Sequence, residues 1–220
     1  MEERFLTTVR CYADPISPYA WLALADLARI EAAGARVVVV PVLFAGLLDA
    51  HGTVGPAEID AKRRYMARDV MREAARRGLP FAGPPGHPFN PLTALRMCTA
   101  IDDDARRRTL FVALTRATWE RGEDLMDAAT LVRLADEAGL DGAGLFAAAQ
   151  APAVKQALAD ATAQAIGEGV FGVPTFQVDG ELFWGADRID ALLWHVQGSG
   201  IDEDALRAFL GRAPRAQRQR

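Results

Sequence analysis

Segments with the pattern of a β-strand occur only near the two ends of this chain. Residues 5–12 are rich in strand-forming residue types that alternate between two faces, and residues 37–42 form a β-branched run. The remaining candidate strands, residues 175–178 and 182–184, come much later. The first pair alone cannot form a sheet with both faces covered. We therefore expect an α/β fold in which residues 5–12 and 175–178 share one sheet and the middle of the chain is inserted after the second strand.

Local signals at each end predict how the core is connected. Ser17 and Pro18 open a segment with helical spacing that closes at Gly34, and these residue types are favoured at the N-cap and the first helical position. The chain thus begins β-α-β, with parallel strands. Near the other end, Asp179-Gly180 separates two strand segments, as in a tight type I′ hairpin turn.

The middle of the chain is rich in Ala and Arg and has helical spacing, interrupted by a Gly/Pro stretch. The helices expected in this block and after the hairpin are residues 56–77, 91–101, 105–121, 128–137, 143–149, 151–168, 187–196 and 202–210.

This pattern also predicts a division into domains. We expect one domain made of residues 1–55 plus 168–211 and an all-helical insertion domain at residues 56–167. The Arg-rich residues 212–220 are expected to form a flexible tail.

Composition and charge exclude several classes of protein. The net charge is −4, and nucleic-acid binding needs a basic face, so no nucleic-acid partner is expected. The longest apolar run, residues 37–48, is shorter than the roughly 20 residues of a membrane-spanning helix. Cys11 and Cys98 form neither a CxxC nor a Cys/His cluster, so we expect no metal site. The N-terminus lacks the apolar segment of a secretory signal, which predicts a cytoplasmic protein.

Residues 167–172 match GxGxxG, the pattern of a dinucleotide-binding turn. That turn functions when a strand precedes it and a helix follows. Here a helix precedes and a strand follows, so we expect a glycine helix cap and turn instead.

Two short motifs are candidates for a functional site. Ser17 lies where a strand meets a helix, and a hydroxyl at a helix N-terminus is well placed to stabilise an anion such as a thiolate. The alternative is an ordinary N-cap. Pro174 directly precedes a strand, which is a common position for proline. We predict instead a cis Val173-Pro174 bond, which would turn the Val173 N–H and C=O outward toward an extended peptide ligand.

The order of these features is that of a thioredoxin-like fold with an inserted helical domain. In detail the chain resembles the family of kappa-class glutathione transferases and 2-hydroxychromene-2-carboxylate isomerases over nearly its whole length. The matching segments are residues 14–19 (DPISPY), 41–43 (PVL), 62–69 (KRRYMARD), 87–96 (HPFNPLTALR), 169–176 (GVFGVPTF) and 183–188 (FWGADR).

The resemblance implies glutathione as the cofactor and a homodimer as the assembly. It places Ser17 at the glutathione sulfur as the catalytic residue. It also implies that Val173 and Pro174 lie along the glutathione backbone and that Asp187 lies near the γ-glutamyl end.

Other residues are candidates for binding. Lys62 shares a helix face with Tyr65 and Asp69 and could meet an anionic ligand, so we count it with the cofactor-binding residues. The alternative is a solvated charged face, because Lys62 begins a run that includes Arg63, Arg64, Arg68 and Arg72. The family's usual polar side chains are replaced here by Thr53 and Ala186, and each lost hydrogen bond is worth about 0.5–1.5 kcal/mol.

An apolar slot for an aromatic substrate is a further prediction, although aromatic side chains lie more often in cores than in clefts. The residues expected to line the substrate pocket are Tyr19, Tyr65, Phe89 and Asn90. Residues expected near them are Phe44, Arg96 and Trp184.

The resemblance implies a glutathione-dependent isomerase of an aromatic acid similar to 2-hydroxychromene-2-carboxylate. In this hypothesis a Ser17-stabilised glutathione thiolate adds reversibly to the substrate. The alternatives are a kappa-like transferase or peroxidase that consumes glutathione, and a non-catalytic thioredoxin-like module that binds a peptide at Val173-Pro174. A disulfide oxidoreductase is disfavoured because a CxxC here would need cysteines at Ser17 and Ala20.

Overall fold

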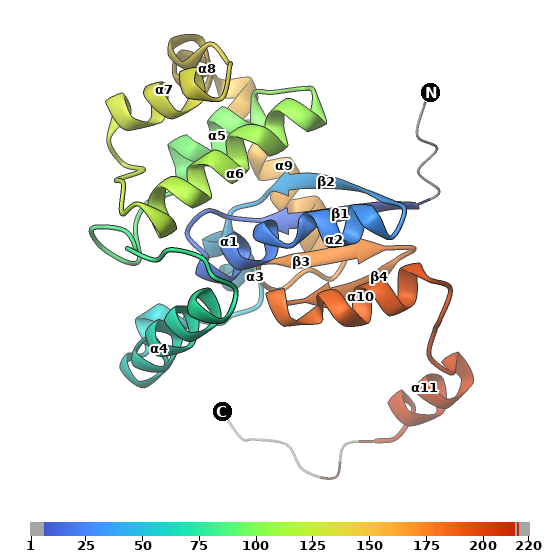
Figure 1. Ribbon diagram of the computed structural model, residues 1–220. Coiled ribbons are helices and arrows are strands. Elements are labelled where there is room, and N and C mark those ends of the chain that lie inside the picture. Colours follow the sequence, from blue (N-terminus) through green and yellow to red (C-terminus); the bar gives the residue numbers. More distant parts are fainter. Residues whose placement is uncertain (1–6, 214, 216–220) are drawn as a thin grey trace.

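The two ends of the chain form a single four-stranded sheet. The computed structural model describes residues 7–213 and 215. The strand order is β2-β1-β3-β4, with β1 (Thr7–Ala13) parallel to β2 (Ala35–Pro41) and antiparallel to β3 (Thr175–Val178) (Figure 1). Cys11 pairs with Phe176 across the β1–β3 ladder. The prediction that both ends share one sheet is therefore confirmed for the described part of β1; residues 5 and 6 lie outside the described residues.

The last strand, β4 (Glu181–Trp184), is joined to β3 by the predicted tight hairpin. Asp179 and Gly180 both have positive φ, 51° and 84°, as the two central residues of a type I′ turn require. Glycine adopts this conformation without strain, and Asp is one of the few other residues that tolerate it.

Helices cover both faces of the sheet. In Figure 1, α1 (Pro18–Ala25), α2 (Leu27–Ala32) and α10 (Ile189–Val196) lie in front of the strands, and α9 (Pro152–Gly167) passes behind them. The prediction of a single helix over residues 18–34 was wrong, because the helix is interrupted at Asp26. The Asp26 N–H closes the end of α1 on Ala23 O, and its carboxylate accepts a hydrogen bond from Arg77 at 2.8 Å.

A further helix, α3 (Phe44–Ala50), follows β2 where the sequence predicted none. Leu43, at its N-cap position, has no capping side chain of its own. Distant residues supply the acceptors instead: Thr162 Oγ1 accepts from Leu43 N at 3.0 Å, and Asp14 Oδ2 accepts from Phe44 N at 2.9 Å. A helix that begins on tertiary partners gives no local capping signal.

The inserted elements between β2 and β3 lie on two sides of the core. α5 (Leu92–Thr99), α6 (Asp104–Glu120), α7 (Ala128–Glu137) and α8 (Gly142–Ala148) gather beyond β2, whereas α4 (Asp60–Arg76) stands apart on the other side (Figure 1). The helix predicted over 56–77 is interrupted: a 3₁₀ turn, η1 (Pro56–Glu58), ends at Ile59, whose backbone is extended. The boundaries of the insertion domain at residues 56 and 167 stay a prediction.

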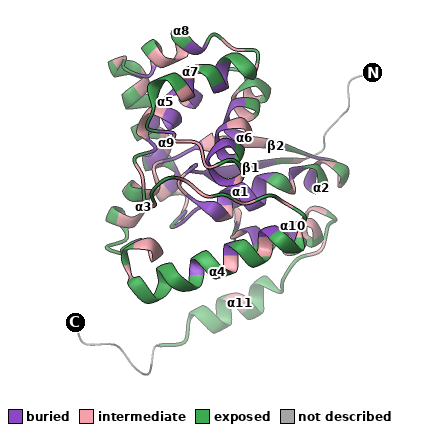
Figure 2. Cartoon of the chain, turned by 60° about the vertical axis from the view of Figure 1, so that its left-hand side comes forward, coloured by how far each residue is buried: buried purple, intermediate pink, exposed green. Residues whose placement is uncertain are grey.

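Burial follows this arrangement. The strands β1, β2 and β3 and the helix α1 are largely buried at the centre of the molecule, whereas α4 is mostly exposed and buries only Met66, Val70 and Ala74 (Figure 2). The chain ends with a 3₁₀ turn, η2 (Ala186–Arg188), then α10 and the exposed α11 (Glu203–Leu210). Most of the predicted flexible tail lies outside the described residues. No helix among residues 7–213 is long and apolar enough to cross a membrane.

Candidate active site

A cavity of about 1560 Å³ lies between α4 and the core. Two segments of the core, residues 14–19 and 172–174, line one side, which we call the loop wall; α4 lines the opposite side, which we call the α4 wall. The structure brings all of the predicted site residues to this cavity: Ser17, Tyr19, Lys62, Tyr65, Phe89, Asn90, Val173, Pro174 and Asp187. Their roles remain predictions.

Ser17 lies at the N-terminus of α1 with its hydroxyl almost fully buried. The hydroxyl oxygen accepts a hydrogen bond from Ala20 N at 3.2 Å, which makes Ser17 the N-cap of the helix, as its sequence context predicts. The hydroxyl proton is donated to the carbonyl oxygen of Val173 at 3.3 Å. This bond is long, so the hydroxyl can turn toward a ligand at little cost.

The Val173-Pro174 peptide bond is cis, as predicted. The carbonyl of Val173 does not point freely outward, because it accepts the Ser17 hydroxyl. Among the described residues, no acceptor receives the Val173 N–H. Trp184 packs against the preceding Gly172 so closely that a Cβ at that position would lie 2.6 Å from the indole nitrogen.

Side chains from two distant segments hold the loop that carries Ser17. Trp119 of α6 donates its indole N–H to Pro15 O at 2.9 Å, and His87 Nε2 lies 3.0 Å from Ile16 O. His87 packs edge-on against Trp119, with ring centroids 5.4 Å apart. Burial lowers the pKa of His87, so the neutral imidazole with its proton on Nε2 makes this bond. The loop wall is thus fixed from outside its own segment.

Asp14 also belongs to this wall. Its side chain is fully buried, and its oxygens accept hydrogen bonds from Ile16 N and Phe44 N, both at 2.9 Å. Burial raises the pKa of this carboxyl to about 7, against the lowering effect of the two N–H donors.

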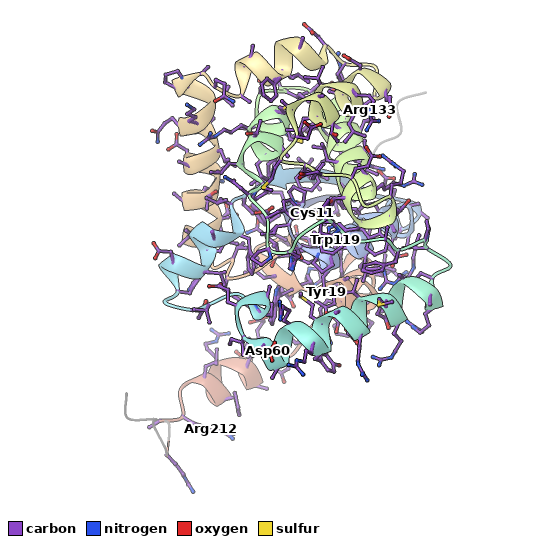
Figure 3. The ribbon with its side chains drawn as sticks, turned by 90° about the vertical axis from the view of Figure 1, so that its left-hand side faces the viewer. Cys11, Tyr19, Asp60, Trp119, Arg133 and Arg212 are labelled. Atoms are coloured by element: carbon purple, nitrogen blue, oxygen red, sulfur yellow. The ribbon has the colours of Figure 1, made fainter. Side chains whose placement is uncertain are left out.

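The α4 wall is built differently. Lys62 is exposed and forms no ion pair with any residue the structure describes, whereas Arg63, Arg64 and Arg72 pair with acidic residues of the same helix. Tyr19 donates to Asp69 Oδ2 at 3.0 Å across the cavity, and Figure 3 shows Tyr19 beside α4. Burial and this hydrogen bond both raise the pKa of Tyr19, so its phenol stays protonated.

Several aromatic side chains reach the cavity. Phe44, Phe89 and Trp184 line it as expected, and Phe171, which the sequence analysis did not single out, lies edge-on to Trp184 with centroids 4.8 Å apart. Arg96 is not among the lining residues, so its expected place at the pocket wall was wrong: it is half-buried on α5, and its buried Nε has no hydrogen-bond partner among the described residues.

The remaining sequence motifs have structural explanations. In the GxGxxG segment, Gly169 has a φ of 89° and Val170 N donates to Ala165 O at 2.9 Å, which closes the end of α9 as a glycine cap and turn. Cys11 and Cys98 are both fully buried, and burial raises the pKa of each thiol. No group of side chains in the described ranges has the composition and geometry of a metal site.

A sequence model of the DSBA-like thioredoxin domain matches residues 8–197, most of the chain. The chain belongs to the DSBA-like thioredoxin family. With Ser17 and Ala20 at the start of α1, this DSBA-like domain has no pair of cysteines there.

Similarity to individual relatives is more informative than the family match. The chain is 32% identical over 190 residues to 2-hydroxychromene-2-carboxylate isomerase of Sphingobium xenophagum, covering 84% of this chain and 95% of the relative. It is 28% identical to glutathione S-transferase kappa 1 of Homo sapiens, covering 87% of this chain and 91% of the relative. A solved 2-hydroxychromene-2-carboxylate isomerase shares the fold, with a TM-score of 0.78 at 23% identity over 92% of this chain and 96% of that one.

Sequence reasoning missed the residues that hold the DSBA-like site in place. Asp14 and His87 were noticed only as letters of matching motifs, and Trp119 was not noticed at all. Their hydrogen bonds join segments that lie 30 to 104 positions apart. For Asp14 a signal was present, because a carboxylate at the end of a buried strand needs polar partners.

Proposed function

We propose that this protein is a glutathione-dependent isomerase of an aromatic acid of the 2-hydroxychromene-2-carboxylate kind. The observation that carries the proposal is the Ser17 hydroxyl, buried beside Val173 at the N-terminus of α1 and facing a cavity of about 1560 Å³. Identity of 32% to a 2-hydroxychromene-2-carboxylate isomerase supports the reaction type. The relatives named above, an isomerase and a transferase, are both enzymes, which supports catalysis over simple binding.

The residues present fit glutathione, an extended anionic tripeptide. The Val173 N–H is available to pair with a peptide carbonyl. Lys62 offers a cation to a carboxylate. The exposed Asp187 side chain pairs with Arg188 through Oδ2 at 2.6 Å, and its Oδ1 offers an acceptor to an ammonium group. The cavity exceeds the roughly 300–1,000 Å³ of common ligand sites, which leaves room for a second molecule beside the tripeptide.

Two substitutions in this site weaken the fit without removing it. Thr53 Oγ1 bonds to Leu48 O at 3.4 Å, so its hydroxyl is engaged within its own turn. Ala186 has no polar side chain and is buried. The backbone edge at Val173 therefore has the larger share in binding glutathione.

When bound, glutathione would supply a thiolate nucleophile for reversible addition to a conjugated carbon–carbon double bond, which would allow rotation about that bond and leave glutathione unconsumed. Ser17 turns its proton from Val173 O to the sulfur and so stabilises the anionic thiolate. The N-terminal end of α1 adds a favourable dipole at the same point.

The remaining residues of the site orient the substrate and exclude water from it. Tyr65, Phe89 and Trp184 present aromatic surface to the ring of a substrate. Asn90 is tied to Leu92 N through its side-chain oxygen, which leaves the amide nitrogen free to donate. A homodimer and a cytoplasmic location remain predictions.

A glutathione transferase that consumes its cofactor is the second candidate. The observation that favours it is the 28% identity to a kappa-class transferase over most of both chains. Both reactions need a stabilised thiolate at Ser17, so the site geometry is shared.

One incubation distinguishes these functions. The protein is mixed with glutathione and 2-hydroxychromene-2-carboxylate, and product and free thiol are both followed in time. An isomerase forms product at constant thiol, whereas a transferase consumes one thiol per product. Ser17→Ala is the test variant and Ser199→Ala, which changes the same residue type far along the chain, is the matched control. Glutathione binding without any product would support the peptide-binding module instead.

A further inference from the structure

The Asp14 side chain joins the loop that carries Ser17 to the N-terminus of α3. Its Oδ1 accepts from Ile16 N, inside the loop that leads to Ser17, and its Oδ2 accepts from Phe44 N, the first residue of α3. Its own carbonyl oxygen accepts from Ser17 N at 3.0 Å. One residue therefore fixes two ends of the Ser17 loop and the start of a neighbouring helix.

No cationic side chain in the described part of the chain forms an ion pair with the Asp14 carboxyl. It is fully buried, and only burial and the two N–H donors act on its pKa. The titratable side chains on the adjoining segments have partners elsewhere: Tyr12 donates to Glu168, His87 faces Ile16 O, and His51 faces Val170 O. Further charged side chains line the cavity on or next to α2, α4, η1, η2 and α10, and Glu58 among them accepts from Gly55 N. They are Asp26, Arg29, Glu58, Lys62, Asp69, Glu73, Arg76, Arg77, Asp187, Arg188 and Asp190.

We propose that Asp14 is a positioning residue whose ionised carboxylate clamps the Ser17 loop to the first turn of α3 and thereby fixes the Ser17 hydroxyl beside Val173. An ionised carboxylate only accepts hydrogen bonds, so it satisfies both N–H groups at once. A proton on either oxygen would face an N–H, and one of the two bonds would be lost. Asp14 acts through Ser17 and does not touch the reacting atoms.

The catalytic meaning of this clamp rests on the proposed function, but the clamp itself is tested without glutathione. In the wild-type protein, the amide protons of Ile16, Phe44 and Ser17 are followed by NMR from pH 5 to pH 9. We expect all three to shift with one common midpoint near neutral pH, because all three bond to Asp14. Separate midpoints, or a Ser17 amide that does not move, would overturn the proposal.

A second experiment tests the link from Asp14 to the thiolate. The pH midpoint of the bound glutathione thiol is measured by thiolate absorbance in wild type, Asp14→Asn, Ser17→Ala and the double variant. Asn can accept only one of the two N–H bonds, so Asp14→Asn should raise the midpoint by about one pH unit in the wild-type background and leave it unchanged in Ser17→Ala. Asp49→Asn, an exposed change on α3, is the matched control and should have no effect.

The outcomes separate the possible failures. An equal rise in both backgrounds would show a general structural role, and a fall would show that the Asp14 charge merely repels the thiolate; either result overturns the proposal. If wild type does not bind glutathione, the proposed function fails, and the amide titration alone decides the clamp. If Asp14→Asn does not fold, the amide titration of the wild-type protein still tests whether Asp14 clamps the loop.

Discussion

The two walls of the cavity differ in how they are held. The loop wall is buried, and its backbone carbonyls are engaged by Trp119 and His87 from other segments. The α4 wall is mostly exposed, buries three residues, and pairs most of its arginines along its own helix (Figure 2). In the proposed function, the Ser17 hydroxyl therefore lies on the buried wall, whereas Lys62 and Tyr65, which are proposed to contact ligands, lie on the exposed wall.

This contrast separates stability from selectivity. Changes on the loop wall should lower the stability of the fold and the rate of reaction, because its parts depend on one another. Changes on the α4 wall should alter substrate binding and leave stability nearly intact, since exposed side chains away from packed features contribute little to folding.

The largest difference in stability is expected between Trp119 and Tyr65. Trp119→Ala removes a buried ring and its bond to Pro15 O, which should cost about 3–5 kcal/mol of unfolding free energy. Tyr65→Ala, at a side chain 65% exposed on the α4 wall, should change it by less than about 0.5 kcal/mol. Urea denaturation of both variants measures this, and similar losses would show that the walls do not differ.

Lys62 tests the α4 wall in activity. Lys62→Met keeps the apolar stem and removes a cation that forms no ion pair in the described structure. We expect the KM for glutathione to rise about tenfold, with kcat and the melting temperature nearly unchanged. The matched control is Arg64→Met, at a cation already paired with Asp60. A fall in kcat alone would place Lys62 in the chemistry and contradict its role in binding.

A smaller effect is expected from pH at His87. Burial lowers its pKa in the folded protein below the ordinary value of 6.5, so the unfolded chain binds the proton more readily. The stabilising effect is thus present above pH 6.5 and is lost as the pH falls below it.

The matched variant is His87→Gln, whose amide can still donate to Ile16 O. Unfolding free energies of wild type and His87→Gln are compared between pH 5 and pH 8. The wild type should lose stability relative to the variant on the acidic side only, while the titration of Asp14 is common to both and cancels. A difference that does not change with pH would show that His87 does not carry the effect.

The sequence predicted those parts of the fold that have local causes. The hairpin at Asp179-Gly180 follows from two residues that tolerate positive φ, and the N-cap at Ser17 follows from one hydroxyl and one proline. The sequence did not predict the features that depend on residues far apart in the chain. The first N–H groups of α3 donate to acceptors from Asp14 and Thr162, and Asp26, where the first helix is interrupted, is held by Arg77.

The candidate site shows the same division. Its lining residues were predicted from a resemblance that matched short motifs, and the structure brings them to one cavity. The supports of the loop wall, above all Trp119, could not be predicted because their contacts cross about a hundred positions of chain. Arg96 was misplaced because helical spacing alone does not say which face of α5 turns toward the cavity.

The central claim is that the Ser17 hydroxyl stabilises a bound glutathione thiolate, and the thiol titration of the complex tests it most directly. Thiolate absorbance of bound glutathione is recorded against pH in wild type, Ser17→Ala and Ser199→Ala. A free thiol titrates near pH 8.5, and each pH unit below that value represents about 1.4 kcal/mol of stabilisation. We predict a midpoint below the free value in wild type and Ser199→Ala, a clearly higher one with reduced turnover in Ser17→Ala, and similar glutathione affinity in all three. Identical titration curves and unchanged turnover in Ser17→Ala would contradict the account.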